Sequence, residues 1–469
     1  MTGKILLEFQ TKMAPTRYIL LYVGIAIAAL AVRFYQLGDI NKPVFDEIYF
    51  PKFAYHYIQQ QPFFHSHPPL AKYTMQGAIA LYHALPWVNE PALGTVDFSQ
   101  LNPVSYRWGN ATLGFFAAIF FAYSAWRLTK SHLFTVIVFA FVGLDGALIV
   151  SSRFGLSNVH IQFWGGLSVF LALLTVQTRN WLYPLLLGIS LGCVACIKWS
   201  GLSYWAMSIA LCSLIYLVKL LQVNLASNSW LKSGLIISSP MRKSLLPYLF
   251  CLTLIPALTY SVLWLPDLQL NTKFDFVQTH QQFFSYHNNR VAEDAHPYCS
   301  KWYSWPLMQR PISYHFEKLP INEQAQACYK NVHSFANPLL YWWSSFAVLF
   351  MCFYTVYKIR FDIKHRILTN ELVTCGVILL GYFANWLPWA LVSRCTFLYH
   401  YQSAAIFSFM SLAYLLCLLH KTNLRLTRVL FVIILVSIFL SFVYWLPFQL
   451  GIPLEKSAFY QRMWFNSWI

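Results

Sequence analysis

Two carboxylates stand side by side in the stretch VFDEIYF, in apolar and aromatic surroundings. Asp46 and Glu47 follow the first long apolar segment closely, which predicts a position near a membrane surface. Adjacent residues on a helix point about 100° apart, so the two carboxylates are not expected to share one proton. We expect one to act as a general base while the other orients a partner or braces the loop. The alternative is a solvated helix N-terminus favoured by the helix dipole.

Two prolines follow a histidine in the stretch FFHSHPPLAKY, residues 63–73. Pro68 and Pro69 fix φ and extend the residue before them, so the side chain of His67 is expected to be held still. His65 lies two residues earlier and is a second candidate for the site. A purely structural turn is the alternative.

Basic residues lie at the predicted outer ends of four different helices: Arg107 in YRWGN, Arg153 in SSRFG, Lys198 in IKWSG and Arg394 in SRCTFLYHY. Four such cations could converge on one anion, and the forked donors of arginine suit phosphate oxygens. We therefore predict a phosphate site. The alternative is that each side chain reaches separately to lipid headgroups.

Aromatic rings and a few polar groups are concentrated in HPYCSKWYSWPLMQRPISYHFE, residues 296–317. Aromatic faces suit a sugar ring or an extended peptide, and they suit interfacial anchoring equally. The candidates for contact with a sugar or an acceptor are His296, Tyr298, Trp302, Trp305 and Arg310.

These candidates must be positioned by a membrane protein. The 469 residues are 58% hydrophobic and only 10% charged, whereas soluble proteins average about 25% charged. We predict an all-α polytopic membrane protein. Its net charge of +17 is assigned to cytoplasmic loops and anionic lipid rather than to nucleic acid binding. No cleavable signal is evident after the first apolar run.

About eleven segments are long and apolar enough to cross a bilayer. They are 18–36, 107–126, 132–151, 157–175, 181–197, 202–218, 245–266, 336–357, 368–392, 399–419 and 429–447. We predict one domain over residues 1–469 with two long outer segments, 38–106 and 267–335, that carry amphipathic surface helices. An odd number of spans places the two termini on opposite sides.

Lys and Arg in short loops predict the orientation. One set of short loops is densely basic, which places it and the N-terminus in the cytoplasm, and the C-terminus outside. The basic residues are Lys4, Lys12, Arg17, Arg127, Lys130, Arg179, Lys219, Lys232, Arg242, Lys243, Lys358, Arg360, Lys364, Arg366, Lys421, Arg425 and Arg428. Most acids fall on the other side, so carboxylate chemistry is expected there. Cys299 and Cys328 share the second outer segment and could form a disulfide in that oxidising location.

At these residues the chain resembles the protein O-mannosyltransferase family, membrane enzymes of the GT-C glycosyltransferase fold. The resemblance runs in family order from about residue 44 to residue 402. Its motifs are FDEIYFPKFAYHYI, HPPLAK, YRW, SSRF, IKWSGL, HPY-x-SKWYSWP, RPISYHFE, ANPLLYWW, LPW and SR-x-x-FLYHY. The last motif adds His400 to the candidates for the donor phosphate and Tyr399 to those for a sugar or acceptor.

The resemblance implies a polyprenyl- or dolichyl-phosphate-linked mannose as donor and a Ser or Thr hydroxyl of a secreted or membrane protein as acceptor, with inversion at the sugar. It implies that Asp46 is the base, with Glu47 beside it, and that Arg107 lies near the lipid phosphate. The soluble β-trefoil insert of eukaryotic members is absent. That absence predicts a bacterial plasma-membrane enzyme whose active site lies on the non-cytoplasmic face, and which could work beside the secretion translocon.

Two departures from the family pattern concern carboxylates. His65 and Asn158 stand where members usually have aspartates, so a bound divalent metal is not expected, and we predict no cofactor. Two alternatives remain open. One is a GT-C transferase that acts on a lipid or glycan acceptor, and the other is an inactive partner subunit.

Overall fold

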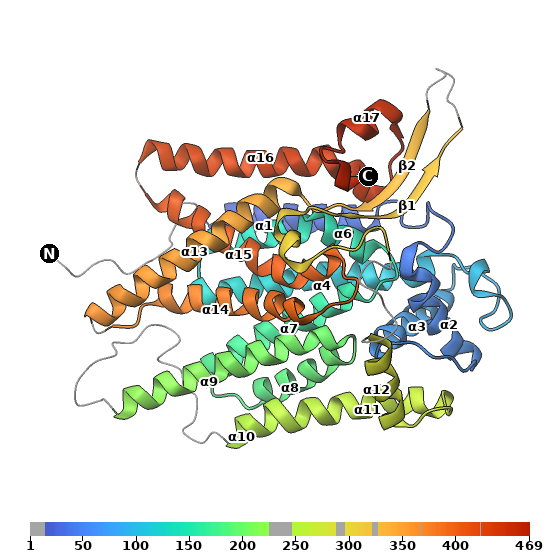
Figure 1. The fold of residues 1–469 in the computed structure, drawn as a ribbon, viewed down its shortest axis with the longest axis horizontal. Helices are drawn as coiled ribbons and strands as arrows, with labels where there is room; N and C mark the ends of the chain where they lie inside the picture. The colour runs from blue at the N-terminus through green and yellow to red at the C-terminus, as the bar shows by residue number, and fades with distance from the viewer. Residues whose placement is uncertain (1–14, 225–245, 288–295, 321–326, 366, 423) are drawn as a thin grey trace.

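The computed structural model describes residues 15–224, 246–287, 296–320, 327–365, 367–422 and 424–469. Long helices run roughly alongside one another, and short helices and strands gather at one end of them (Figure 1). The long helices are α1 (Pro15–Phe34), α4 (Val104–Thr129), α7 (Asn158–Gln177), α9 (Leu202–Asn224), α11 (Ile255–Leu270), α13 (Pro338–His365), α14 (Asn370–Trp386), α15 (Gln402–Lys421) and α16 (Arg425–Leu450). The short α10 (Leu246–Leu249) and the π-helical turn η5 (Phe250–Leu254) lead directly into α11.

Nine helical spans in the described ranges are long and apolar enough to cross a membrane, which confirms a polytopic membrane protein. The pair α5 (His132–Leu144) and α6 (Gly146–Arg153), which meet at a bend of 52°, adds a tenth if it is counted as one span. The predicted span 181–197 corresponds to α8 (Leu182–Ala195), whose 14 residues are short of a full crossing. The predicted count of eleven is therefore not confirmed.

The bend between α5 and α6 is encoded by an Asp-Gly pair. Asp145 ends α5 with an extended backbone and caps α6, because its carboxylate accepts from the Leu148 amide at 3.1 Å. Its other oxygen accepts from the amide of Asn337 at 3.2 Å. A Cβ on Gly146 would lie 2.1 Å from the carbonyl oxygen of Phe335, so only glycine fits this close approach.

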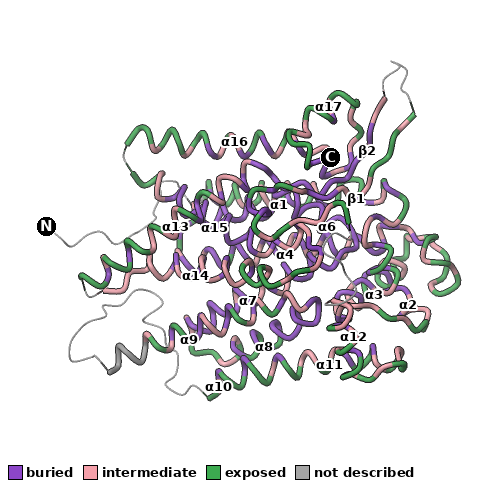
Figure 2. Tube along the Cα trace, viewed as in Figure 1, coloured by how far each residue is buried: buried purple, intermediate pink, exposed green. Residues whose placement is uncertain are grey.

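The interior and the lipid-facing surface are formed by different helices (Figure 2). The spans that contain α7 and α15 are mostly buried within the protein, and α4 packs against α7. By contrast, α16 exposes large apolar side chains along its length, among them Val432, Ile433, Phe439 and Leu440. A membrane-spanning helix needs such a surface where it meets lipid, since its backbone groups are already paired within the helix.

The segments 38–106 and 267–335 contain short helices, and two strands of the second segment pair with a third near the C-terminus in a sheet that was not predicted. The helices are η1 (Phe45–Ile48), α2 (Phe50–Gln59), α3 (Leu70–His83), η2 (Phe98–Gln100), α12 (Phe276–Ser285) and η7 (Trp302–Leu307). The strands are β1 (Ile312–Lys318), β2 (Cys328–Ser334) and β3 (Leu454–Glu455), which pair antiparallel in the order β1-β2-β3. In register, Phe316 faces Asn331 and Tyr329 faces Leu454.

The remaining short elements join or follow the spans. They are η3 (Trp199–Gly201), η8 (Leu387–Leu391), η9 (Leu398–Tyr401), α17 (Lys456–Gln461) and η10 (Asn466–Trp468). The C-terminal residues lie at the same end of the molecule as β1 and β2 (Figure 1). There, the Arg310 guanidinium donates to the carbonyl oxygen of Ser467 at 2.7 Å.

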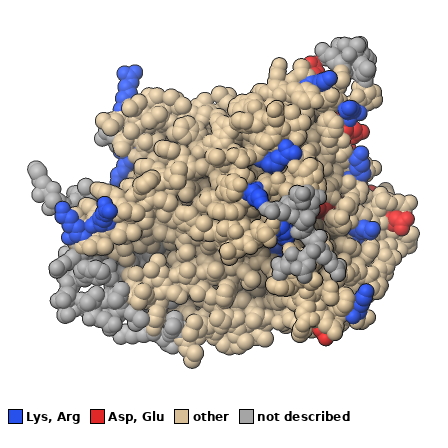
Figure 3. Space-filling view, in the orientation of Figure 1, with Lys and Arg blue, Asp and Glu red and all other residues tan. Residues whose placement is uncertain are grey.

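Charge divides between the two ends of the helices on the face drawn in Figure 3. Acidic atoms appear only towards the end that carries β1, β2, α2 and α3, and the opposite end shows basic atoms alone. This is the asymmetry on which the orientation rests, and the orientation itself stays a prediction. Six of the basic residues used for it lie outside the described residues: Lys4, Lys12, Lys232, Arg242, Lys243 and Arg366.

Candidate active site

The two adjacent carboxylates have different surroundings. Glu47 is fully buried, and four N–H groups share its two oxygens equally. Oε1 accepts from the amide of Gly155 at 2.7 Å and from Nε of Arg107 at 2.9 Å. Oε2 accepts from the amide of Val44 at 2.8 Å and from Nη2 of Arg107 at 2.7 Å. Glu47 therefore fastens η1 to α4 and to the turn after α6.

All five N–H donors of Arg107 are used within the protein. Two bind Glu47, and the other three bind the carbonyl oxygens of Leu37, Ile40 and Lys42 at 2.9–3.1 Å. The side chain is fully buried, so this geometry leaves no donor for the phosphate that was predicted to lie beside it.

The turn after α6, which supplies the Gly155 amide to Glu47, is held in place by α4 and packs closely against Pro51. Asn110, one turn after Arg107 on α4, donates to the carbonyl oxygens of Phe154 and Leu156 at 2.7 and 2.9 Å. Gly155 lies between them, and a Cβ there would come within 2.4 Å of the Pro51 ring. Because Gly155 has no side chain, the turn can approach Pro51 closely enough for the Gly155 amide to donate to Glu47.

Asp46 has no such partners. Its side chain is half-buried, and no hydrogen bond or ion pair to another described residue engages its carboxylate. Burial raises the pKa of Asp46, while the charges of Lys198 and His296 act in the opposite direction. A carboxylate with free oxygens and a raised pKa has the properties of a general base.

Of the four predicted cations, Lys198 lies near Asp46 and Arg394 lies near Lys198. Burial lowers the pKa of Lys198 to about 8, opposed by Asp46 and reinforced by Arg394. The Lys198 ammonium donates to Oδ1 of Asn158 at 3.0 Å, which is a neutral partner. Arg394 is half-buried, and its one hydrogen bond within the described chain goes to the carbonyl oxygen of its neighbour Cys395, at 3.3 Å. Both cations therefore have donors left for an anion.

The fourth predicted cation, Arg153, lies at the end of α1. Its Nη1 donates to the carbonyl oxygens of Val32, Arg33 and Tyr35, at the C-terminal end of α1. A cation at a helix C-terminus is favoured by the helix dipole and satisfies carbonyl groups that lack helical partners. The geometry thus separates Lys198 and its neighbour Arg394 from Arg107 and Arg153, which hold the scaffold.

The predicted histidines His65 and His67 form a half-buried ring cluster near Lys198. His65 and His67 have ring centroids 5.2 Å apart, and His67 stacks on His287 at 5.4 Å. Burial lowers the pKa of His65 and of His67 well below the usual range, and nearby lysines add to the effect. Both rings are therefore neutral at pH 7 and offer hydrogen bonds rather than charge.

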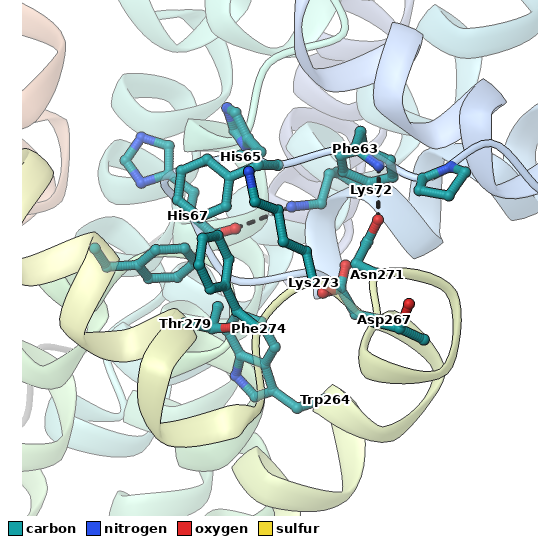
Figure 4. Close-up of a pocket in the computed structure, with 14 residues that line it drawn as sticks. Phe63, His65, His67, Lys72, Trp264, Asp267, Asn271, Lys273, Phe274 and Thr279 are labelled. Carbon is teal, nitrogen blue, oxygen red and sulfur yellow. Dashed lines mark hydrogen bonds between the residues drawn. The ribbon is translucent and has the colours of Figure 1, made fainter.

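A cavity of about 400 Å³ adjoins this cluster between the first outer segment and the α11–α12 region (Figure 4). Lys72 lines it and donates to the carbonyl oxygen of His67 at 2.9 Å. Burial lowers the pKa of Lys72 to about 8, and Asp267 opposes this effect. Asp267 itself accepts a hydrogen bond from the hydroxyl of Tyr57. A cavity of this size is large enough for a small polar ligand group.

The aromatic candidates of the second outer segment mostly hold it in place. Trp305 is fully buried, with its ring 5.7 Å from Trp389 and 6.0 Å from His400. The ring of Trp302 lies 4.9 Å from Trp386.

Arg310 and Tyr298 belong to the same anchoring. Arg310 binds the carbonyl oxygens of Pro297, Ser467 and Ile469, and its guanidinium lies 5.0 Å from the Tyr298 ring centroid. Tyr399 differs, since its ring lies 5.6 Å from the Lys198 ammonium, next to the Asp46 region.

The disulfide differs from the predicted pairing. Cys299 is joined to Cys395, whereas Cys328 is a free thiol at the start of β2. The prediction of Cys299 with Cys328 was wrong because it considered only cysteines of the same outer segment. The segment before η9 runs alongside Cys299, and the amide of Ser300 donates to the carbonyl oxygen of Thr396 at 2.8 Å.

Several residues at the site were not predicted, although the sequence held a signal for some. Lys72 belongs to the quoted HPPLAK motif, one helical turn after the prolines. Asp267 is an acid at the end of an apolar span, a costly position that points to function. His287 had no such signal, and neither had Asn271, which lines the cavity and accepts from the Phe63 amide at 2.7 Å. Across the described ranges, no three His, Cys, Asp or Glu side chains lie close enough together to hold a metal ion.

Two family models cover nearly the whole chain. The model for dolichyl-phosphate-mannose-protein mannosyltransferase matches residues 23–272. The model for the C-terminal four-transmembrane region of protein O-mannosyltransferase matches residues 273–468.

Similar proteins and structures agree with these matches. A polyprenol-phosphate-mannose–protein mannosyltransferase of Mycobacterium tuberculosis is 25% identical over 95% of this chain and 90% of its own length. The corresponding protein of Corynebacterium glutamicum is 24% identical over 95% and 92%. The structure of the Saccharomyces cerevisiae protein O-mannosyltransferase Pmt1-Pmt2 complex bound to the sugar donor aligns with a TM-score of 0.76 at 15% identity. The alignment covers 98% of this chain and 93% of that one.

Proposed function

Because the chain belongs to the dolichyl-phosphate-mannose–protein mannosyltransferase family, we propose that Asp46 catalyses transfer of mannose from polyprenyl-phosphate mannose to a Ser or Thr hydroxyl. Named relatives with this activity match most of their length to this chain, which supports the donor and the acceptor class. The observation that carries the assignment of the base is the contrast between Asp46, whose carboxylate has no hydrogen-bond partner in the described chain, and Glu47, whose carboxylate accepts four hydrogen bonds.

The reaction places each group in one role. Asp46 takes the hydroxyl proton as the hydroxyl oxygen forms a bond to C1 of mannose. The bond from C1 to the phosphate oxygen breaks on the opposite face, and its electron pair leaves with the lipid phosphate. The charge on that phosphate grows as the bond breaks, so Lys198 and Arg394 stabilise the transition state more than the bound donor.

The neighbouring groups position the reactants. Tyr399 and the neutral His65, His67 and His400 offer rings and hydrogen bonds around the sugar and phosphate. The cavity beside Lys72 provides room for a part of the donor or acceptor. Arg107 and Glu47 act through the scaffold, because they fix the backbone that carries Asp46.

The cellular setting is also part of the proposal. The active site faces the non-cytoplasmic side of a bacterial plasma membrane, with the N-terminus in the cytoplasm and the C-terminus outside. The acceptor is then a secreted or membrane protein, met as it leaves the translocon. Acidic atoms gather at the end of the face in Figure 3 that carries α2, and Asp46 lies in η1 directly before α2, which supports this orientation.

The test uses purified protein, radiolabelled polyprenyl-phosphate mannose and a Ser/Thr-rich peptide, with an Ala-substituted peptide as control. The wild-type chain is expected to label only the hydroxyl peptide. Asp46→Asn is expected to lower the rate by about 100-fold or more, the usual effect of losing a positioned base. Full transfer by Asp46→Asn would refute the base assignment. Transfer to a lipid or glycan but never to a peptide would favour the alternative acceptor class.

A further inference from the structure

Two irregular segments meet beside the candidate active site, and a disulfide joins them. Residues 299–301 precede η7, and residues 392–397 connect η8 to η9 without regular secondary structure. Cys299 and Cys395 are bonded, with their Cα atoms 5.2 Å apart. The next residues add two hydrogen bonds, from the Ser300 amide to the Thr396 carbonyl and from the Thr396 hydroxyl to the Ser300 carbonyl, at 2.8 and 2.7 Å.

Arg394 directly precedes the bonded Cys395. No side-chain acceptor within the described residues holds its guanidinium, whose single hydrogen bond goes to the Cys395 carbonyl oxygen. Arg107 and Arg153 are fixed by contacts of their own, but the position of Arg394 depends on its backbone. That backbone is held by the disulfide and by the Ser300–Thr396 pair.

We propose that the Cys299–Cys395 disulfide is a positioning clamp that keeps the Arg394 guanidinium beside Lys198, where the donor phosphate leaves. This inference rests on the proposed function, since it assigns Arg394 to that phosphate. The clamp restricts Arg394 before the donor binds. Less conformational entropy is therefore lost on binding, which is the general benefit of preorganisation.

The clamp is accessible from solvent on one side. Cys395 is buried, but Cys299 is half-exposed and lines an open cleft of about 650 Å³ together with Lys301, Arg310 and Trp342. A small water-soluble phosphine can therefore reach the bond. Reduction converts the disulfide to two thiols and the phosphine to its oxide, with water supplying the oxygen and the two protons.

The experiment is a double-mutant cycle. The change Cys299→Ser with Cys395→Ser is made in the wild-type background and in Arg394→Ala, and the KM for polyprenyl-phosphate mannose and the Kd for polyprenyl phosphate are measured. With Arg394 present, loss of the clamp is expected to raise both constants about tenfold, the effect of weakening one charge-assisted hydrogen bond. In Arg394→Ala the same change is expected to alter them less than about twofold, because the clamp acts through that residue.

Phosphine treatment of the wild-type chain removes the disulfide without any substitution and is expected to raise both constants to the same extent. Cys328→Ser is the matched control and should keep the wild-type KM and Kd. Equal factors in both backgrounds would overturn the clamp, as would free thiols at Cys299 and Cys395 in untreated protein by mass-spectrometric labelling. A chain that binds polyprenyl phosphate with the expected cycle but transfers nothing would refute the proposed function and keep the clamp.

Discussion

The sharpest prediction concerns Glu47→Gln, the nearly isosteric change at the buried member of the carboxylate pair. Each oxygen of Glu47 accepts two hydrogen bonds, one of them from Arg107. A glutamine keeps one oxygen and turns an NH₂ group towards two donors, so it loses at least two charge-assisted bonds. At about 1.5–3 kcal/mol each, the loss is about 3–6 kcal/mol. This agrees with the roughly 3–5 kcal/mol expected when one partner of a buried ion pair is removed.

The assay compares thermal unfolding in detergent with the mannose transfer rate. Glu47→Gln is expected to unfold at a clearly lower temperature and to lose activity in step with its folded fraction. Asp46→Asn is expected to unfold like the wild type and yet lose transfer. Glu317→Gln, which breaks a contact of a half-exposed carboxylate with His315, is the matched control and should change stability by less than about 1 kcal/mol. If Glu47→Gln unfolds like the wild type, or Asp46→Asn is the less stable variant, the division of roles is wrong.

Four further predictions concern the charges around Asp46 and the expected absence of a metal. The pH–rate profile should be bell-shaped: activity falls below the raised pKa of Asp46 as the base is protonated, and falls above about pH 8 as Lys198 loses its charge. Lys198→Arg should move only the alkaline limb to higher pH, since arginine stays charged. Lys72→Arg is the control and should leave that limb in place. The reverse result would assign the alkaline limb to Lys72. Asn158→Asp should raise the donor KM by about three- to tenfold, because a carboxylate beside Lys198 partly neutralises the charge of the ammonium group. An unchanged KM would show that Lys198 does not contact the donor phosphate. Chelation with EDTA should leave transfer unchanged, and loss that Mg²⁺ or Mn²⁺ restores would contradict the prediction of no metal.

The sequence predicted the membrane class and the family because those depend on local patterns. Long apolar runs and motifs such as HPPLAK are readable residue by residue. The bend at Asp145 was not predicted, because an apolar window continues across it and only the Asp-Gly pair marks the break. The β1–β2 pairing was also missed, since the aromatic residues there suggested surface helices.

The separate roles of the arginines could not be predicted from sequence. Arg107, Arg153 and Arg394 all lie near helix ends beside aromatic residues, and that pattern is the same for each. The difference is set by the carbonyl oxygens that surround them, which come from the distant loop at Leu37–Lys42 and from the end of α1. The Cys299–Cys395 pairing has the same origin, because 96 positions of sequence separate the two residues.

The bonds of Glu47 also determine when this protein can be completed during its synthesis. The Gly155 amide is separated from Glu47 by 108 positions, and Arg107 by 60. A ribosome that has just delivered the first outer segment therefore leaves its carboxylates in water at the membrane surface. The Glu47 carboxylate can take its buried place only after α4, α5, α6 and the turn at Gly155 have been inserted, so η1 must wait for those helices before it takes its final shape.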